Sequence, residues 1–189
     1  ERGTVLLTTG FYVAGYAETD GPLGTVAVAE ALNHLGFHSV VVTDKYCKGF
    51  FELKQLDVEY VDIAADEQVY EDILDKYNPV YMISIERCGE NAEHEYANMR
   101  GVSITSETAA IDHLFELAPE KHIPTIGVGD GGNEIGMGNV KDIISEKLEL
   151  NPCVVPVDDL IIATTSNWGA YALTAWLQKL SGEEVLFTF

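Results

Sequence analysis

The side chains with the clearest potential for chemistry are carboxylates that stand in or beside glycine-containing segments. Asp130 and Glu134 lie in the run GVGDGGNEIGMG, which covers residues 127–138, and Glu18 and Asp20 stand two residues apart just before a Gly-Pro pair. Carboxylate and amide oxygens are the ligands that hard divalent cations prefer in proteins. We therefore predict a divalent metal site at Glu18, Asp20, Asp130 and Glu134, with Mg²⁺ or Mn²⁺ favoured and Ca²⁺ also compatible.

Both segments also have interpretations that involve no metal. Gly127, Gly129 and Gly132 match the dinucleotide fingerprint G-x-G-x-x-G, although Asp130 would then face a pyrophosphate. So many glycines between a strand and a helix can also serve close backbone approach or positive φ alone. An acid or threonine before Pro22 is ordinary capping chemistry at the start of a helix. The sequence leaves these alternatives open.

One further carboxylate, Glu86, directly follows the apolar run at residues 80–85. A carboxylate in that place is expected to be partly buried, which raises its pKa unless Arg87 or a bound cation offsets the effect. We therefore predict that Glu86 is the general base of the site.

A parallel sheet would bring these residues together. Short β-branched apolar runs alternate with helical patterns along the chain, which is typical of βαβ units. We predict an α/β fold with a three-layer, doubly wound, mostly parallel six-stranded sheet of Rossmann-like type, and a single domain over residues 1–189. The expected strands are residues 4–9, 39–43, 58–61, 80–85, 125–128 and 160–165, and the expected helices are residues 21–35, 67–77, 107–117 and 167–180. The fourth and sixth strands are almost continuously apolar, so they are expected to be central.

In such a sheet, ligands bind outside the carboxyl ends of the strands. The loops after the first, fourth, fifth and sixth strands therefore deliver the predicted residues to one edge, while Asp158 and Asp159 precede the last strand and belong to the opposite edge. Asn167 is expected to cap the last helix. Cys88 lacks a neighbouring base, and the five histidines show no ligand spacing, so we predict inert or structural roles for them.

The charge balance limits the classes of partner. The chain has 31 acidic against 11 basic residues and a net charge of -20, which repels nucleic acid and anionic lipid and attracts cations. Three widely spaced cysteines argue against a disulfide framework, and no apolar run approaches the ~20 residues of a membrane span. We therefore expect a cytoplasmic protein with no nucleic-acid or membrane partner. The chain begins at Glu1 rather than at methionine, so we allow for a missing N-terminal segment.

Five ordered motifs, which together span nearly the whole chain, resemble the D-glutamate cyclase-like C-terminal domain family. The motifs are Glu18-Thr19-Asp20-Gly21-Pro22, Ile85-Glu86-Arg87, Tyr96 with Asn98-Met99-Arg100, residues 127–138, and Ser166-Asn167-Trp168-Gly169 with Tyr171-Ala172-Leu173. Two-domain members of this family are similar to enzymes that convert D-glutamate to 5-oxo-D-proline and water. The resemblance implies a small anionic substrate.

Combined with the predicted acidic crevice, the resemblance implies a metal-assisted lyase in which Glu86 takes the ammonium proton. Arg87 or Arg100 would bind the α-carboxylate, and backbone N–H groups near Asn133 would stabilise the oxyanion. The other expected substrate-binding residues are Tyr96, Asn98, Gly131, Gly132, Ser166 and Asn167. A metal-dependent phosphohydrolase and a non-catalytic ligand-binding subunit are the alternatives, and a homo-oligomer is possible.

Overall fold

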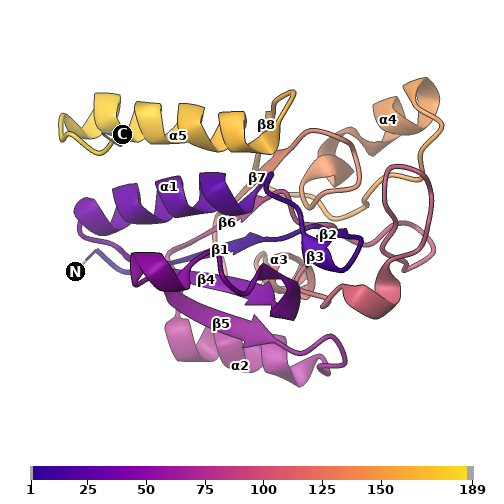
Figure 1. The fold of residues 1–189 in the computed structure, drawn as a ribbon, viewed down its shortest axis with the longest axis horizontal. Helices are drawn as coiled ribbons and strands as arrows, with labels where there is room; N and C mark the ends of the chain where they lie inside the picture. Colours follow the sequence, from indigo (N-terminus) through magenta and orange to yellow (C-terminus); the bar gives the residue numbers. More distant parts are fainter. Residues whose placement is uncertain (1, 187–189) are drawn as a thin grey trace.

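The computed structural model describes residues 2–186, and its centre is a six-stranded sheet in which every neighbouring pair of strands is parallel (Figure 1). The strands run in the order β5-β4-β1-β6-β7-β8. Their bounds are β1 Thr4–Thr9, β4 His38–Asp44, β5 Asp57–Val61, β6 Tyr81–Ile85, β7 Thr125–Gly129 and β8 Asp159–Ile162. A separate antiparallel hairpin consists of β2 Tyr12–Val13 and β3 Tyr16–Ala17.

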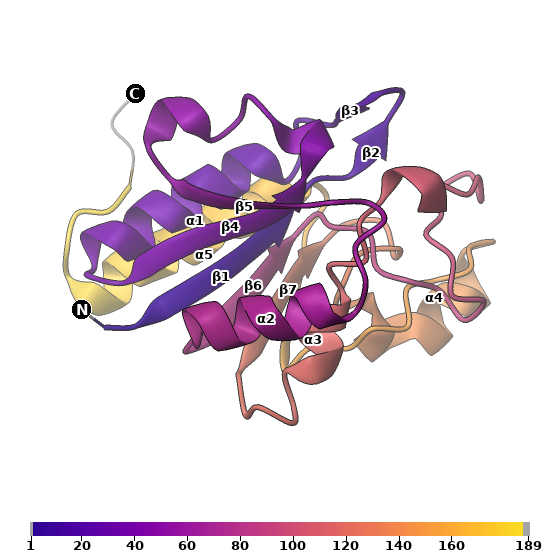
Figure 2. The ribbon, with the colours of Figure 1, turned by 90° about the horizontal axis from the view of Figure 1, so that it is seen from below.

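Helices cover both faces of the sheet, so the predicted three-layer, Rossmann-like α/β fold is confirmed. One layer contains α1 Pro22–His34 and α5 Ser166–Ser181, and the other contains α2 Gln68–Tyr77 and α3 His113–Leu117. Figure 2 shows α2 and α3 in front of the sheet, with α1 and α5 behind it. The remaining helix is α4 Lys141–Lys147, and short 3-10 turns lie at Lys45–Cys47 (η1), Glu52–Lys54 (η2), Thr105–Glu107 (η3) and Met137–Val140 (η4).

The alternation of side chains along β1 explains why two hydrophobic cores form. Leu6 points into the core beneath α2 and α3, whereas Val5 and Leu7 point into the core beneath α1 and α5. Because successive side chains of a strand face opposite sides of the sheet, one apolar strand can fill both cores.

The strand order places a topological switch between β1 and β6. From β1 the sheet grows toward β4 on one side and toward β6 on the other, and Thr9 lies opposite Ile85 in the register. The loops that follow β1 and β6 therefore leave the sheet side by side and then diverge. Ligands of doubly wound folds bind at such a crevice.

The structure corrects the expectations for the last strand and the third helix. β8 pairs only with β7 and carries half-buried or exposed side chains, so the apolar run at residues 160–165 belongs to an edge strand that α5 covers on one face. Only the end of the predicted helix at residues 107–117 is helical. The helix is interrupted at Thr108, whose backbone is extended, and the chain then turns at residues 111–112, while Ala109 and Ile111 are buried in the core. The β2–β3 hairpin and α4 were not predicted.

Candidate active site

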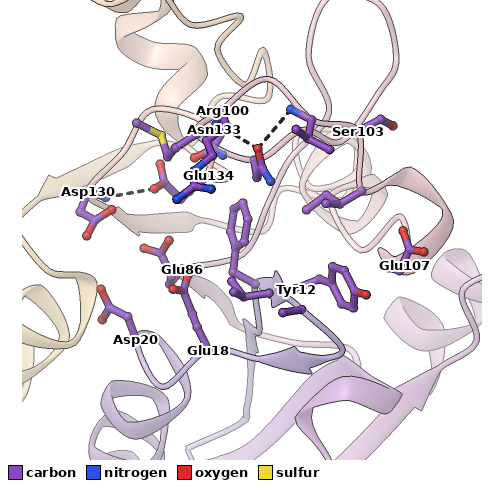
Figure 3. Close-up of a pocket in the computed structure, with 17 residues that line it drawn as sticks. Tyr12, Glu18, Asp20, Glu86, Arg100, Ser103, Glu107, Asp130, Asn133 and Glu134 are labelled. Atoms are coloured by element: carbon purple, nitrogen blue, oxygen red, sulfur yellow. Dashed lines mark hydrogen bonds between the residues drawn. The ribbon is translucent and has the colours of Figure 1, made fainter.

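Three carboxylates converge at the carboxyl edge of the sheet. Asp20 lies in the loop that leads from β1 to α1, Glu86 directly follows β6, and Asp130 directly follows β7. One oxygen from each of the three lies within 4.8 Å of the others. Figure 3 shows their side chains turned toward a shared space. Because these loops lie far apart in sequence, the sheet topology alone brings the carboxylates together.

The carboxylates form one end of a cavity of about 640 Å³. Glu18 lies beside them, and Tyr12 and Glu107 lie toward the other end (Figure 3). The remaining lining residues come from three segments, which are residues 11–14, residues 98–104 and the loop with Asn133 and Glu134. The cavity thus combines an acidic end with walls from residues 11–14 and 98–104 that are mostly apolar.

Asp20 is held in place by the start of α5. Its two carboxylate oxygens accept hydrogen bonds from the backbone N–H groups of Ser166, at 3.0 Å, and of Asn167, at 2.7 Å. Asn167 in turn accepts hydrogen bonds from the backbone N–H groups of Gly21 and Gly24, at 2.9 and 2.7 Å. Asn167 therefore caps α1, so the expectation that it caps its own helix is wrong, and Asp20 caps α5 instead. This exchange of caps fixes Asp20 beside the cavity.

Glu86 is buried and has a strained backbone. Its side chain is only 4 % exposed, and its φ of 49° lies in the left-handed region. Burial raises the pKa of Glu86 well above its ordinary value, the negative charge of Glu134 adds to the rise, and a hydrogen bond from the Ser166 hydroxyl opposes it. Backbone strain of this kind costs folding energy, so it persists only where the surrounding structure enforces it, and such positions cluster at functional sites.

Asp130 and Glu18 complete the electrostatic environment. Burial, followed by the charges of Glu134 and Asp20, raises the pKa of Asp130 to about 7. Burial and the charges of Asp20 and Glu134 also raise the pKa of Glu18. Carboxyl groups this close together cannot all ionise near neutral pH without a compensating cation. Oxygen ligands in such a cluster suit a hard divalent cation, so the residues fit the predicted metal.

The structure gives Glu134 a different place from the one that we predicted. Its carboxylate accepts hydrogen bonds from the backbone N–H groups of Gly131 and Gly132, both at 2.7 Å, and it is almost fully buried. Glu134 thus shapes the loop that carries Asp130 and is not among the three converging carboxylates. The N–H groups of Gly131 and Gly132 that a pyrophosphate would need in the dinucleotide interpretation are already bound to Glu134.

Arg87 does not reach the cavity. Its guanidinium group is 1 % exposed and donates to Asp44 at 2.7 Å, to the carbonyl of Gly10 at 3.0 Å and to the carbonyl of Ala109 at 2.6 Å. Arg87 is therefore not placed to make the expected contact with a substrate carboxylate, because both terminal nitrogens of its guanidinium group donate inside the protein and its Nε is buried. Asp44 was missed, although its position at the end of an apolar strand was a usable signal.

Of the two arginines predicted to bind the substrate, Arg100 is the one that lies at the cavity. It lines the cavity on a turn in which Asn98 accepts hydrogen bonds from the N–H groups of Arg100 and Val102, at 2.9 and 3.1 Å. Asn133 also lines the cavity, and its amide donates to the carbonyl of Ala97 at 2.8 Å. Arg100 brings a positive charge to a cavity whose other charged lining residues are acidic.

Other predicted substrate-binding residues lie behind the cavity wall. Tyr96 is buried and donates to Asp112 at 2.6 Å, while Ser166 and Asn167 are buried in the contacts with Glu86 and Asp20. Among the described residues, none of these three lines the cavity. They support the residues that do.

Sequence reasoning missed the β2–β3 hairpin as a wall of the cavity. The turn between its strands has two residues with positive φ, Ala14 at 50° and Gly15 at 99°. Turns of this type match the twist of a hairpin. Two-residue strands give almost no periodic signal, so only the Ala-Gly dipeptide between two tyrosines pointed to them.

The residues that we set aside do not line the cavity. Asp158 accepts hydrogen bonds from the backbone and hydroxyl of Thr125 at the start of β7, which is the opposite edge of the sheet, as predicted. Cys88 is buried, and burial raises the pKa of its thiol. His94 is exposed and contacts Glu90.

Comparison with known proteins identifies relatives of the chain. A model of the family described as "D-glutamate cyclase-like, C-terminal" matches residues 1–188. The human protein "D-glutamate cyclase, mitochondrial" is 34% identical over 204 residues, a match that covers 94% of this chain and 33% of the human protein. The chain therefore spans about a third of the length of this relative. The relative's name gives a mitochondrial location, so a cytoplasmic location of this chain stays a prediction.

Solved structures give only distant likenesses. The Bordetella bronchiseptica enzyme WbmH in complex with NAD+ has a TM-score of 0.46 and 12% identity, over 96% of this chain and 54% of that one. The UDP-glucose 4-epimerase from Brucella ovis in complex with NAD has a TM-score of 0.44 and 18% identity, over 68% and 36%. Likenesses this distant say nothing about a ligand of this chain. Over the described residues, no helix is both long and apolar enough to cross a membrane.

Proposed function

Because this chain belongs to the D-glutamate cyclase-like C-terminal family, we propose that it is a metal-assisted lyase that converts D-glutamate to 5-oxo-D-proline and water. The observation that carries the proposal is the convergence of Asp20, Glu86 and Asp130 at one end of a cavity that Arg100 also lines. In such a cavity, a cation held by the carboxylates and the guanidinium group of Arg100 would each face one carboxylate of a small amino dicarboxylate.

Asp20 and Asp130, with Glu18 beside them, would hold the divalent cation. The cation would draw electron density from the γ-carboxylate of the substrate, which is otherwise a poor electrophile. Asp20 is kept in position by the start of α5, and Asp130 is kept in position by the loop that Glu134 organises. This rigid support is what a catalytic constellation needs.

Glu86 would accept the proton that the substrate ammonium group must lose before its nitrogen can attack the γ-carbon. As the C–N bond forms, one C–O bond of the γ-carboxylate breaks, and its oxygen leaves as water with the two protons that the nitrogen gives up. Its pKa is raised by burial and by neighbouring charges, and a cation beside it would lower that pKa again. A carboxylate whose pKa is raised by burial and lowered by a cation suits the role of a general base. Arg100 would bind the α-carboxylate as a planar fork and hold the amine close to the γ-carbon.

A chiral assay with matched variants tests this function. Purified protein with Mn²⁺ should form 5-oxo-D-proline from D-glutamate, and Asp130→Asn should abolish the reaction while the protein remains folded. Asp159→Asn is the matched control, because Asp159 is an exposed carboxylate at the opposite edge of the sheet. Equal losses of activity in the two variants, or no product from the parent protein, would refute the proposed site.

The phosphohydrolase alternative has less support from the geometry. Helix N-termini near the carboxylates would suit a phosphate ester, because their N–H groups bind anions. Asp20 and Asn167 already accept hydrogen bonds from the first N–H groups of α5 and α1. Release of phosphate from a phosphomonoester with Mn²⁺, without turnover of D-glutamate, would nevertheless favour this alternative over the cyclase.

A further inference from the structure

The outer face of α5 is apolar and has no partner within the described part of the chain. Its exposed positions follow helical spacing, and the large side chains among them are 69, 40, 54 and 78% exposed at Trp168, Tyr171, Trp176 and Leu180. The opposite face of the same helix is buried against α1 and the sheet through Gly169, Ala170 and Thr174. A surface helix normally shows polar residues on its outer face, so α5 is apolar where water should cover it.

This face is also free of acidic residues. The chain has 31 acidic residues among 189, yet the 16 residues of α5 include none. The one basic residue of α5, Lys179, lies over the ring of Trp176 at 4.3 Å. Two copies of a chain with a net charge of -20 repel each other. The acid-free face is therefore a surface on which two copies can meet at a low electrostatic cost.

The order of large and small residues along the face is close to symmetric. Ala172 and Ala175 are exposed near its middle, with Trp168 and Tyr171 on one side and Trp176 and Leu180 on the other. In an antiparallel pair of α5 helices, the alanines would allow close approach at the crossing point, and the aromatic end of each helix would pack against the apolar end of the other. A surface that is complementary to itself in this way is the requirement for a twofold-symmetric interface.

The area of the face agrees with what a stable dimer needs. An aromatic side chain offers roughly 150–250 Å² for burial. Two tryptophans, one tyrosine and one leucine at the measured exposures supply several hundred Å² per copy. Specific interfaces bury roughly 800 Å² per partner, so the apolar core of such an interface is already present on α5.

We propose that two copies of this chain form a symmetric dimer in which the outer faces of their α5 helices pack antiparallel. The dimer interface lies beside the active site of each copy, because α5 begins at Ser166, which contacts Asp20 and Glu86. The proposal does not depend on the reaction that the site performs.

Sedimentation equilibrium of the full chain from about 1 to 100 µM tests the proposal. The parent should approach twice its monomer mass of 20.7 kDa. Trp176→Glu should weaken association at least 100-fold, and Ala172→Lys, which changes an exposed and well-tolerated helix position, should do the same. Leu53→Glu is the matched control, because Leu53 is 91% exposed on η2 and away from α5, and it should associate like the parent.

Fluorescence gives an independent readout, because both tryptophans of the chain lie on this face. Their emission should shift to longer wavelength as the parent is diluted and should remain at long wavelength in Ala172→Lys. A parent that is monomeric at 100 µM would overturn the proposal. A dimer that both α5 variants leave intact would overturn it as well, since the contact would then lie elsewhere.

Discussion

At the scale of single residues, the positions after the strands were easier to predict than the directions of their side chains. Glu18, Asp20, Glu86 and Asp130 all line the cavity, because parallel strands bring their carboxyl ends to one edge. Arg87 is adjacent to Glu86 in sequence but points to the other side of the sheet and pairs with Asp44. The direction was not predictable because the chain leaves the strand at a residue with positive φ.

The role of Glu86 can be separated from that of a metal ligand. Glu86→Gln keeps the shape of the side chain but removes the base, so turnover of D-glutamate should fall by roughly 100-fold or more. The affinity for Mn²⁺, measured by calorimetry, should stay within a few-fold of the parent value. A joint collapse of metal affinity and turnover would make Glu86 a ligand, and Glu18 would then be the next candidate for the base.

The crowded carboxylates should make the metal-free protein less stable as the pH rises. The folded-state pKa of Asp130 is raised to about 7, so its contribution to stability is complete below its unfolded pKa and is lost as the pH rises through 7. In EDTA, the parent should lose several degrees of melting temperature between pH 5 and pH 8. Asp130 is partly open to solvent, which limits the size of the effect.

Asp130→Asn should remove part of this loss, so that in EDTA at pH 8 the variant melts at a higher temperature than the parent. Asp159→Asn, which removes an exposed carboxylate elsewhere, should melt like the parent. A variant Asp130→Asn that is less stable than the parent at pH 8 would show that the repulsion we infer is absent.

The two arginines should respond in opposite ways to substitution. Arg87→Met leaves the Asp44 carboxylate buried without its partner, and the loss of one member of a buried pair costs about 3–5 kcal/mol of unfolding free energy. Arg100→Met should leave stability unchanged and raise the KM for D-glutamate about tenfold or more. Chemical denaturation and steady-state kinetics of both variants measure this. A stable Arg87→Met protein with a raised KM would restore Arg87 to the binding site.

At the scale of elements, the buried parts of the fold were predictable, and the irregular parts were not. Strands and long helices repeat an apolar pattern with a fixed period, so β1, β4, β6, α1 and α5 were identified from that pattern alone. The hairpin β2–β3 and the extended segment after η3 depend on contacts with distant residues. Their positions follow from tertiary packing, which no local pattern records.

The exchange of caps between α1 and α5 is the contact that ties these two helices to the site. Asn167→Ala removes two acceptor contacts at the start of α1 and should cost about 1–2 kcal/mol of unfolding free energy. Because Asn167 also fixes the loop with Asp20, the affinity for Mn²⁺ should fall as well. Thr164→Ala, at an exposed neighbouring position, is the control and should change neither quantity. Unchanged stability and metal affinity in Asn167→Ala would show that the exchange of caps does not support the site.

At the scale of the whole molecule, part of the excess negative charge is concentrated in the cavity. Most acidic side chains are solvated, but the cavity gathers several of them where burial opposes their ionisation. A net charge of -20 attracts cations to the molecule, and the proposed metal site would give one cation a defined place. The composition indicated a cation, and only the folded arrangement shows where it would bind.

The central claim is that these carboxylates form a metal-dependent cyclase site. The most direct test is the rate of 5-oxo-D-proline formation from D-glutamate, measured on one preparation first in EDTA and then after addition of excess Mn²⁺ or Mg²⁺. We expect a rate near the uncatalysed background in EDTA and its restoration by at least 100-fold when the metal is added. An equal rate in EDTA and in metal, or no product in either condition, would show that these carboxylates do not form such a site.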